Sequence, residues 1–228
     1  MTQTLPEDEW VIKMVLCGDP GTGKTSLALR YTQQSFCITE KPTIGVGIYV
    51  QSAATTQNDY RFQIWDTSGQ ERFRSMLPTW FQGARVLCFL YNTNSRASFD
   101  AIPLWLAHAR WAPLPSGEWG SHTNEGALGI LIGTQTDRVT YREVDAEDVA
   151  IPFAKTHNLL FAETSALTGQ GIRECFDDIC AQLDARVAQW PRPAIAPALL
   201  GGGGPEGDPL LKEKKKKKCT CCFFYLKR

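Results

Sequence analysis

Short apolar runs alternate along this chain with longer stretches in which apolar residues recur at helical spacing. The apolar runs predict strands over 11–17, 47–53, 60–65, 86–91, 128–132 and 160–163. The periodic stretches predict helices over 24–34, 72–81, 95–109, 146–157 and 171–189, with Asp145 as the N-cap of the fourth. This alternation predicts an α/β fold, with a six-stranded, mostly parallel sheet and helices on both faces.

Three segments depart from the alternation. Only the polar residues 54–59 separate the second and third strands, so these two strands are expected to form an antiparallel hairpin. Residues 111–127 are too rich in Pro and Gly for a helix or a strand, and we predict a surface loop there. Beyond Gln189, repeated prolines and the glycines at 201–204 predict a flexible linker.

Charge separates the end of the chain from its body. The chain holds 24 Lys or Arg and 24 Asp or Glu; residues 212–228 hold eight of the basic residues and one acidic residue, Glu213. The tail therefore carries +7 and residues 1–211 carry −7, which indicates a tail that seeks an anionic surface. The predicted organisation is a globular domain over 8–189, a linker over 190–211 and a basic, Cys-containing tail over 212–228.

A phosphate-binding motif follows the first predicted strand directly. Residues 18–25 have the pattern G-x-x-x-x-G-K-[ST] and read Gly18-Asp19-Pro20-Gly21-Thr22-Gly23-Lys24-Thr25. Glycines allow several backbone N–H groups to converge on a polyphosphate at the start of a helix, and the predicted site continues to Ser26. We expect Lys24 to reach the β- and γ-phosphates and Thr25 to offer its hydroxyl to Mg²⁺. The loop alone leaves a GTPase, an ATPase and a nucleoside kinase open.

A second group of candidate residues follows the third strand. Asp66 comes where that strand ends, and a carboxylate there is positioned to hold Mg²⁺ through water. Gly69 can donate its N–H to a γ-phosphate, and Gln70 can orient an attacking water. A nucleoside kinase does not need a water-aligning Gln, so this combination favours nucleotide hydrolysis with Gln70 as the catalytic residue.

With these residues the chain resembles the Ras superfamily and, within it, the Rab family of small GTPases, over roughly residues 10–188. The phosphate loop carries the resemblance together with KPTIGV at 41–46, QIWDTSGQERFRSM at 63–76 and ETSAL at 163–167. The resemblance implies a P-loop small G domain that switches between GTP and GDP, hydrolyses GTP and acts in vesicle and membrane trafficking. It also implies that Thr43 binds Mg²⁺ and the γ-phosphate beside Thr25 and Asp66. A turn residue is the alternative interpretation of Thr43.

The base-reading segment departs from the family pattern. Thr134-Gln135-Thr136-Asp137 stands where the family has Asn-Lys-x-Asp. The Asp137 carboxylate can accept hydrogen bonds from N1–H and the 2-amino group of guanine, a pair that adenine lacks. Thr134 retains a hydroxyl, and the stem of Gln135 can cover the base. The resemblance places Ser165, Ala166 and Leu167 on the other side of the base, so we expect guanine specificity.

Pro20 is the second departure, because the family commonly has Gly or Ser there. Proline removes one backbone donor and fixes φ, so we predict intact binding and leave the effect on turnover open. No residue is an obvious built-in arginine finger, and an activating protein is expected to supply one. The expected partners are the GTPase-activating protein, a nucleotide-exchange factor and switch-region effectors. A monomer is expected, without nucleic acid.

The tail combines a lysine run with Cys219, Cys221 and Cys222. Lysines attract the chain reversibly to an anionic membrane, and acyl or prenyl chains on these cysteines would make the attachment stable. Six residues follow Cys222, which favours S-palmitoylation over geranylgeranylation. The expected location is the cytoplasmic face of an intracellular membrane, in exchange with the cytosol. A solvated lysine run, a nuclear-import patch and a zinc site are the alternatives for the tail.

Two alternatives to the GTPase hypothesis also fit the residues. One is a GTP-loaded scaffold or adaptor subunit with negligible turnover. The other is a P-loop enzyme that uses a different nucleotide, such as a kinase. Measurements of bound nucleotide, of nucleotide displacement and of hydrolysis distinguish the GTPase, the scaffold and the enzyme that uses another nucleotide.

Overall fold

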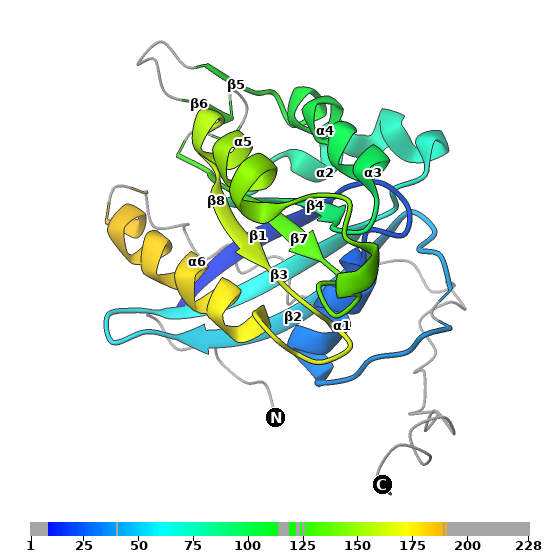
Figure 1. Ribbon diagram of the computed structural model, residues 1–228. Coiled ribbons are helices and arrows are strands. Elements are labelled where there is room, and N and C mark those ends of the chain that lie inside the picture. Colours follow the sequence, from blue (N-terminus) through cyan, green and yellow to red (C-terminus); the bar gives the residue numbers. More distant parts are fainter. Residues whose placement is uncertain are drawn as a thin grey trace, which may run out of the picture. The chain divides into compact units, whose positions relative to one another are not determined.

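The computed structural model describes residues 9–39, 41–113, 119–121, 124, 126–188 and 190 of the 228-residue chain. Its main sheet has six strands in the order β2-β3-β1-β4-β7-β8 (Figure 1). The strands are β1 (Glu9–Cys17), β2 (Val46–Ala54), β3 (Asp59–Thr67), β4 (Val86–Asn92), β7 (Leu128–Thr134) and β8 (Leu160–Glu163). Only β2 and β3 pair antiparallel, and the other neighbours are parallel. The predicted mostly parallel sheet and its hairpin are confirmed.

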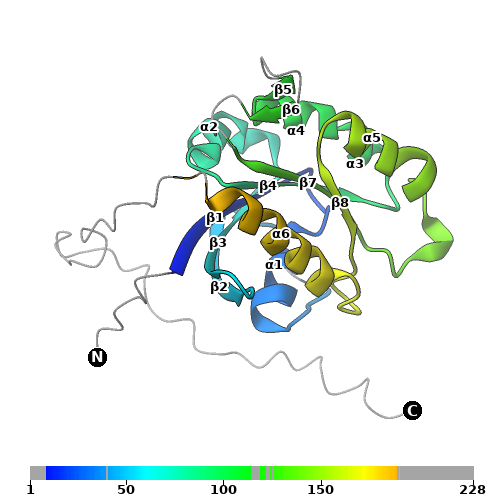
Figure 2. The ribbon, with the colours of Figure 1, turned by 90° about the vertical axis from the view of Figure 1, so that its left-hand side faces the viewer.

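Helices cover both faces of this sheet, as Figure 2 shows in a view turned from that of Figure 1. The α-helices are α1 (Lys24–Gln33), α2 (Leu77–Phe81), α3 (Arg96–Asp100), α4 (Ile102–His108), α5 (Ile151–Thr156) and α6 (Ile172–Val187). Helices η1 (Glu71–Met76) and η2 (Val139–Tyr141) are 3₁₀, and η3 (Ala146–Ala150) is a π-helix. Asp145 caps η3 by accepting from the N–H of Asp148 at 2.9 Å, as predicted.

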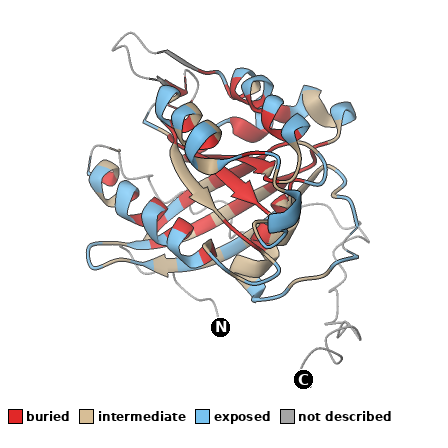
Figure 3. Ribbon diagram, viewed as in Figure 1, coloured by how far each residue is buried: buried red, intermediate tan, exposed pale blue. Residues whose placement is uncertain are grey.

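Two apolar cores lie on the two faces of the sheet, and the buried residues concentrate along its strands (Figure 3). Side chains of a strand point alternately to opposite faces, and β1 shows this directly. Ile12, Met14 and Leu16 join the core under α1 and α6. Val15 and Cys17 join the core under α2 to α5. Because β1 is buried on both sides, it fixes the loop that follows it.

Three of the predicted helices are broken where they were predicted to be continuous. The prediction over 72–81 becomes η1 followed by α2, that over 95–109 becomes α3 and α4, and that over 146–157 becomes η3 and α5. In each case a proline, Pro78, Pro103 or Pro152, lies in the first turn of the second helix. Proline has no N–H to donate to the preceding turn, so the α-helical hydrogen bonds restart there.

The prediction of a plain surface loop over 111–127 is wrong in part. Strands β5 (Trp111–Pro113) and β6 (Trp119–Ser121) pair as a short antiparallel ribbon. Trp111 is only 3% exposed, packs edge-on against Phe89 and donates its indole N–H to the carbonyl of His157 at 2.9 Å. Burial of this large side chain attaches the start of β5 to the core.

The compact unit that contains these elements extends to Trp190, whose ring lies under the guanidinium of Arg85 at 4.4 Å. The domain boundaries inferred from the sequence stay predictions. Apart from Trp190, the predicted linker over 190–211 and tail over 212–228 lie outside the described residues. Within the part of the chain that the structure describes, no helix has the length and apolarity needed to cross a membrane.

Candidate functional site

The loop between β1 and α1 curls around the ammonium group of Lys24. Its Nζ donates to the carbonyls of Gly18 at 2.7 Å and Asp19 at 2.8 Å. Gly23, with φ at 79°, begins α1 in the left-handed conformation, which glycine adopts without strain. At Gly18 a Cβ would collide with the carbonyl oxygen of Leu90, so this position also requires glycine. The loop is therefore closed tightly around a single cation.

Burial changes the chemistry of Lys24. The residue is 6% exposed, and desolvation lowers the pKa of its ammonium group to about 8, while the nearby charge of Asp66 acts in the opposite direction. A buried cation with few competing waters attracts phosphate oxygens more strongly than a surface lysine does. The loop thus offers a concentrated positive charge at the start of a helix.

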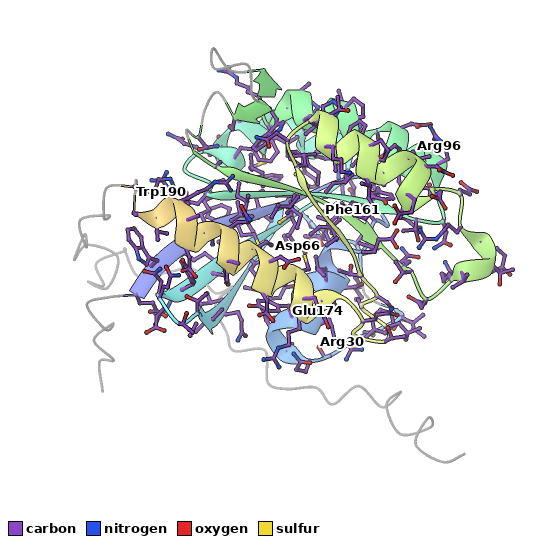
Figure 4. All side chains as sticks on the ribbon, turned by 60° about the vertical axis from the view of Figure 1, so that its left-hand side comes forward. Arg30, Asp66, Arg96, Phe161, Glu174 and Trp190 are labelled. Atoms are coloured by element: carbon purple, nitrogen blue, oxygen red, sulfur yellow. The ribbon has the colours of Figure 1, made fainter. Side chains whose placement is uncertain are left out.

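Three oxygen-bearing side chains from separate segments meet beside this loop. The Thr25 hydroxyl donates to Oδ2 of Asp66 at 2.7 Å, and the Thr43 hydroxyl donates to the same oxygen at 3.1 Å. The two hydroxyl oxygens lie 2.8 Å apart. Asp66 itself is fully buried within β3, one residue before that strand ends, and Figure 4 shows it inside the fold. Thr25 and Thr43 line the cavity described below, and the Asp66 carboxylate is hydrogen-bonded to both of their hydroxyls without being part of the cavity wall.

The segment after β3 lies directly on the phosphate loop. A Cβ built on Gly69 would lie 2.5 Å from both the carbonyl carbon of Asp19 and the nitrogen of Pro20. Only glycine allows this approach, since any side chain would have to displace the loop backbone. Gln70 follows, half-buried, with its backbone N–H donating to the hydroxyl of Ser68 at 3.3 Å. Gly69 and Gln70 therefore stand beside Pro20.

The predicted base-reading residues are tied to the phosphate loop and to one another. The Thr134 hydroxyl donates to the carbonyl of Thr22 at 2.9 Å, and the Gln135 amide donates to that of Gly21 at 2.9 Å. The Ser165 hydroxyl donates to a carboxylate oxygen of Asp137 at 2.6 Å, which orients that carboxylate. Thr134 thus makes a contact with the phosphate loop despite its departure from the family pattern.

Two supporting residues were not found from the sequence. Arg30, at the end of α1 (Figure 4), donates to the carbonyls of Ala166 at 2.6 Å and Leu167 at 2.7 Å. Trp105 of α4 donates its indole N–H to the Asp19 carboxylate at 2.9 Å. These partners are 136, 137 and 86 residues apart along the chain. No motif in the sequence marks either contact.

These segments enclose a cavity of about 570 Å³, within the usual range for small-molecule sites. The predicted site residues that line it are Pro20, Gly21, Gly23, Lys24, Thr25, Ser26, Thr43, Gly69, Gln70, Thr134, Gln135, Asp137, Ala166 and Leu167. Five predicted site residues are not part of the cavity wall, but each contacts a residue that lines it: Gly18, Asp19, Thr22, Asp66 and Ser165. The lipidation candidates Cys219, Cys221 and Cys222 lie outside the described residues. Among the described residues, no group of three or more His, Cys, Asp or Glu side chains could hold a metal ion.

Comparison with known proteins identifies the family. The family model described as "Ras: Ras family" matches residues 13–185. The chain belongs to the Ras family. Ras-related protein RABA3 of Arabidopsis thaliana is 35% identical over 186 residues, which cover 81% of this chain and 74% of that protein. GTP-binding protein ypt3 of Schizosaccharomyces pombe is 33% identical over 177 residues, 78% of each chain. Ras-related protein Rab-18 of Lymnaea stagnalis is 30% identical over 196 residues, 86% of this chain and 91% of that one.

The family model, the relatives and the fold show that this chain is a Rab-like small GTPase. Such a GTPase is a switch that binds guanine nucleotide, hydrolyses GTP and acts in vesicle trafficking. The small G-domain fold inferred from the sequence is confirmed. Nothing in these findings supports the scaffold with negligible turnover. Regulators and effectors are the kinds of partner that this GTPase has.

Proposed function

We propose that the 570 Å³ cavity holds GTP or GDP with Mg²⁺, and that its two ends divide the work of binding. The observation that carries this proposal is the group formed by Thr25, Thr43 and Asp66, whose oxygens lie within 2.7–3.1 Å of one another beside the buried Lys24. Two hydroxyls and a carboxylate are hard oxygen donors, the type that Mg²⁺ prefers. When bound, the ion would neutralise charge on the β- and γ-phosphates.

At the phosphate end, the backbone N–H groups of residues 18–26 other than Pro20, which has none, and the ammonium of Lys24 bind the phosphates. Gly69 donates its N–H to the γ-phosphate, and Thr43 contacts the same group. Loss of the γ-phosphate then removes a partner from two segments at once, so both relax. This pairing of Thr43 with Gly69 is the switch that effectors read.

At the base end, the Asp137 carboxylate accepts hydrogen bonds from N1–H and the 2-amino group of guanine. Its orientation by the Ser165 hydroxyl at 2.6 Å supports this role. Thr134 and Gln135 join the base segment to the phosphate loop at 2.9 Å each, and Arg30 supports the carbonyls of Ala166 and Leu167. Adenine has no donor pair that matches the carboxylate.

Hydrolysis proceeds by in-line attack of water on the γ-phosphorus: a new oxygen–phosphorus bond forms as the bond to the bridging oxygen of GDP breaks. Gln70 orients the water, and Lys24 stabilises charge that develops on the phosphate oxygens. An activating protein supplies an arginine, which in such GTPases raises the rate by about 10³ to 10⁵. An exchange factor opens the site to release GDP.

Nucleotide displacement followed by single-turnover hydrolysis tests this assignment. GDP and GTP should displace a bound fluorescent guanine nucleotide, and ATP should not. Gln70→Ala should then slow hydrolysis more than it weakens binding, while equal rates for the wild type and Pro20→Gly would show that Pro20 does not tune turnover. Displacement by ATP, or hydrolysis insensitive to Gln70, would contradict the proposal.

We also propose that the lysine run and Cys219, Cys221 and Cys222 attach the protein to the anionic cytoplasmic face of an intracellular membrane, in exchange with the cytosol. The basic charge and the clustered thiols support this. Replacing the three cysteines by serine should move the protein from the membrane fraction to the soluble fraction. A triple variant that still fractionates with membranes would rule out lipidation at these positions.

A further inference from the structure

Asp19 places a carboxylate inside a loop whose proposed ligand is strongly negative. Its side chain is nevertheless not part of the cavity wall, although its neighbours Pro20 and Gly21 are. The indole N–H of Trp105 accounts for this orientation, because it donates to Oδ1 of Asp19 at 2.9 Å from a side chain that is only 1% exposed. A buried donor with one acceptor holds the carboxylate in a defined direction.

The backbone of Asp19 has a different set of contacts. Its carbonyl accepts from Nζ of Lys24 at 2.8 Å and from the hydroxyl of Thr22 at 2.8 Å. Its carbonyl carbon lies where Gly69 approaches the loop most closely, 2.5 Å from a Cβ built on that glycine. The residue therefore joins the phosphate-binding cation to the segment that senses the γ-phosphate.

We propose that Trp105 is a positioning residue that keeps the Asp19 carboxylate away from the phosphates and thereby favours the triphosphate over the diphosphate. The inference rests on the proposed function of the cavity. A carboxylate released from Trp105 would turn toward the cavity beside Pro20 and Gly69, where the γ-phosphate would lie. Like charges repel more strongly where water is scarce, so the penalty falls mainly on the nucleotide with the additional phosphate.

Trp105 also packs in the apolar core under α2 to α5, and a variant must separate that role from the hydrogen bond. Trp105→Phe keeps an aromatic ring and removes the donor. Trp111→Phe is the matched control, since Trp111 belongs to the same core and is 3% exposed. Its indole N–H donates at 2.9 Å to the carbonyl of His157, which is not part of the phosphate loop. A loss due to packing alone would affect both variants alike.

The experiment measures displacement of a fluorescent guanine nucleotide from the full-length protein by GDP and by a non-hydrolysable GTP analogue, both with Mg²⁺. Trp105→Phe should lower the affinity for the GTP analogue about tenfold relative to GDP, and Trp111→Phe should leave the ratio unchanged. Adding Asp19→Asn to Trp105→Phe should restore the ratio, because an amide carries no charge. The loss should also shrink at high salt.

A second pair of variants tests the idea with Trp105 intact, in case Trp105→Phe does not fold. Asp19→Glu lengthens the carboxylate beyond the reach of the indole, and Asp19→Gln has the same length without charge. The Glu variant should discriminate against the GTP analogue about tenfold more than the Gln variant. Equal ratios for Glu and Gln, or equal effects of the two Trp variants, would overturn the proposal. Wild-type protein that binds neither nucleotide would instead contradict the proposed function.

Discussion

The two ends of the sheet are both held by side-chain hydrogen bonds, but these bonds serve different purposes. At the end that carries the cavity, Lys24 and Gln135 donate to loop carbonyls, groups that could exchange partners with a ligand. At the opposite end, Oδ1 of Asp184 in α6 accepts from Thr55 at 3.1 Å, Asn58 at 2.7 Å and Tyr60 at 2.6 Å, which fixes the β2–β3 hairpin to α6.

The comparison indicates that nucleotide binding and the stability of the fold depend on different hydrogen bonds. The carbonyls that accept hydrogen bonds at the cavity end belong to the phosphate loop, whose residues Pro20, Gly21, Gly23 and Lys24 line the cavity. The donors to Asp184, which are Thr55, Asn58 and Tyr60, are not part of the cavity wall. Substitutions at the cavity end should therefore change nucleotide affinity more than stability. Substitutions at Asp184 should do the reverse.

The largest expected effect is that of Lys24→Ala. Removing the buried ammonium should weaken GTP and GDP binding by about 10³-fold, because charge-assisted contacts to phosphate are lost. The free energy of unfolding of the nucleotide-free protein should fall by only about 1–2 kcal/mol, because the carbonyls of Gly18 and Asp19 lose a donor. This is less than the loss in binding free energy, since a 10³-fold loss of affinity corresponds to about 4 kcal/mol. Displacement titration and urea unfolding measure the two quantities, with Lys155→Ala, on the exposed face of α5, as control. A large loss of stability with intact nucleotide binding would contradict the claim that contacts at the cavity end affect affinity more than stability.

Asp137→Ala should have the next largest effect. We expect GTP and GDP to bind about 10²-fold more weakly, while the weak binding of ATP stays unchanged, because the lost acceptor is specific to guanine. Competition between the three nucleotides measures this directly. Asp148→Ala removes a similarly exposed carboxylate away from the cavity and should match the wild type. Parallel losses for all three nucleotides would show that Asp137 does not read the base.

Asp184→Ala should lower the free energy of unfolding by about 2–3 kcal/mol, because it leaves the hydroxyl of fully buried Tyr60 without its acceptor. Nucleotide affinity should stay within about twofold of the wild type, since the cavity does not include these residues. Urea unfolding and displacement titration again measure the pair. The control is Asp178→Ala, an exposed position of the same helix. A nucleotide-binding defect in Asp184→Ala would mean that the two ends are coupled.

The smallest expected effect is a difference in acid stability. Burial by itself would raise the pKa of Asp184, but the hydrogen bonds from Tyr60, Asn58 and Thr55 outweigh it and leave the pKa below 3.8. The charged form therefore contributes stability that is fully present above pH 3.8 and is lost as the pH falls through the folded-state pKa. Unfolding curves between roughly pH 5 and pH 3 should fall less steeply for Asp184→Ala than for the wild type. Identical slopes would contradict this account.

Local patterns predicted most of the fold. Apolar runs placed the strands of the main sheet within two residues at each end. The signal is clearest for the central strands β1, β4 and β7, which are mostly buried. The breaks at Pro78, Pro103 and Pro152 were also readable, since proline cannot donate to the preceding turn. They were missed because helical periodicity continues across each proline.

The parts of the candidate site that were not predicted depend on contacts between residues far apart in the sequence. The phosphate loop and Asp66 follow known local patterns, and the structure brings them into contact through the hydrogen bond from Thr25 to Asp66. By contrast, the bond between Trp105 and Asp19 joins residues 86 apart, and the bond between Arg30 and the Ala166 carbonyl spans 136 residues. A single sequence gives no signal for such pairs, because any buried tryptophan or helical arginine looks the same before the chain folds.

The β5–β6 ribbon offers a practical position for labelling. Trp111 anchors one end through His157, and Asn124 anchors the other by donating its amide to the carbonyl of Phe81 at 2.8 Å and accepting from the N–H of Gly83 at 2.8 Å. A short peptide tag inserted between Pro113 and Trp119 would leave both anchors intact, because lengthening the connection between two paired strands costs little entropy. An optical or affinity handle could then be carried while the nucleotide cavity and the basic tail stay unmodified.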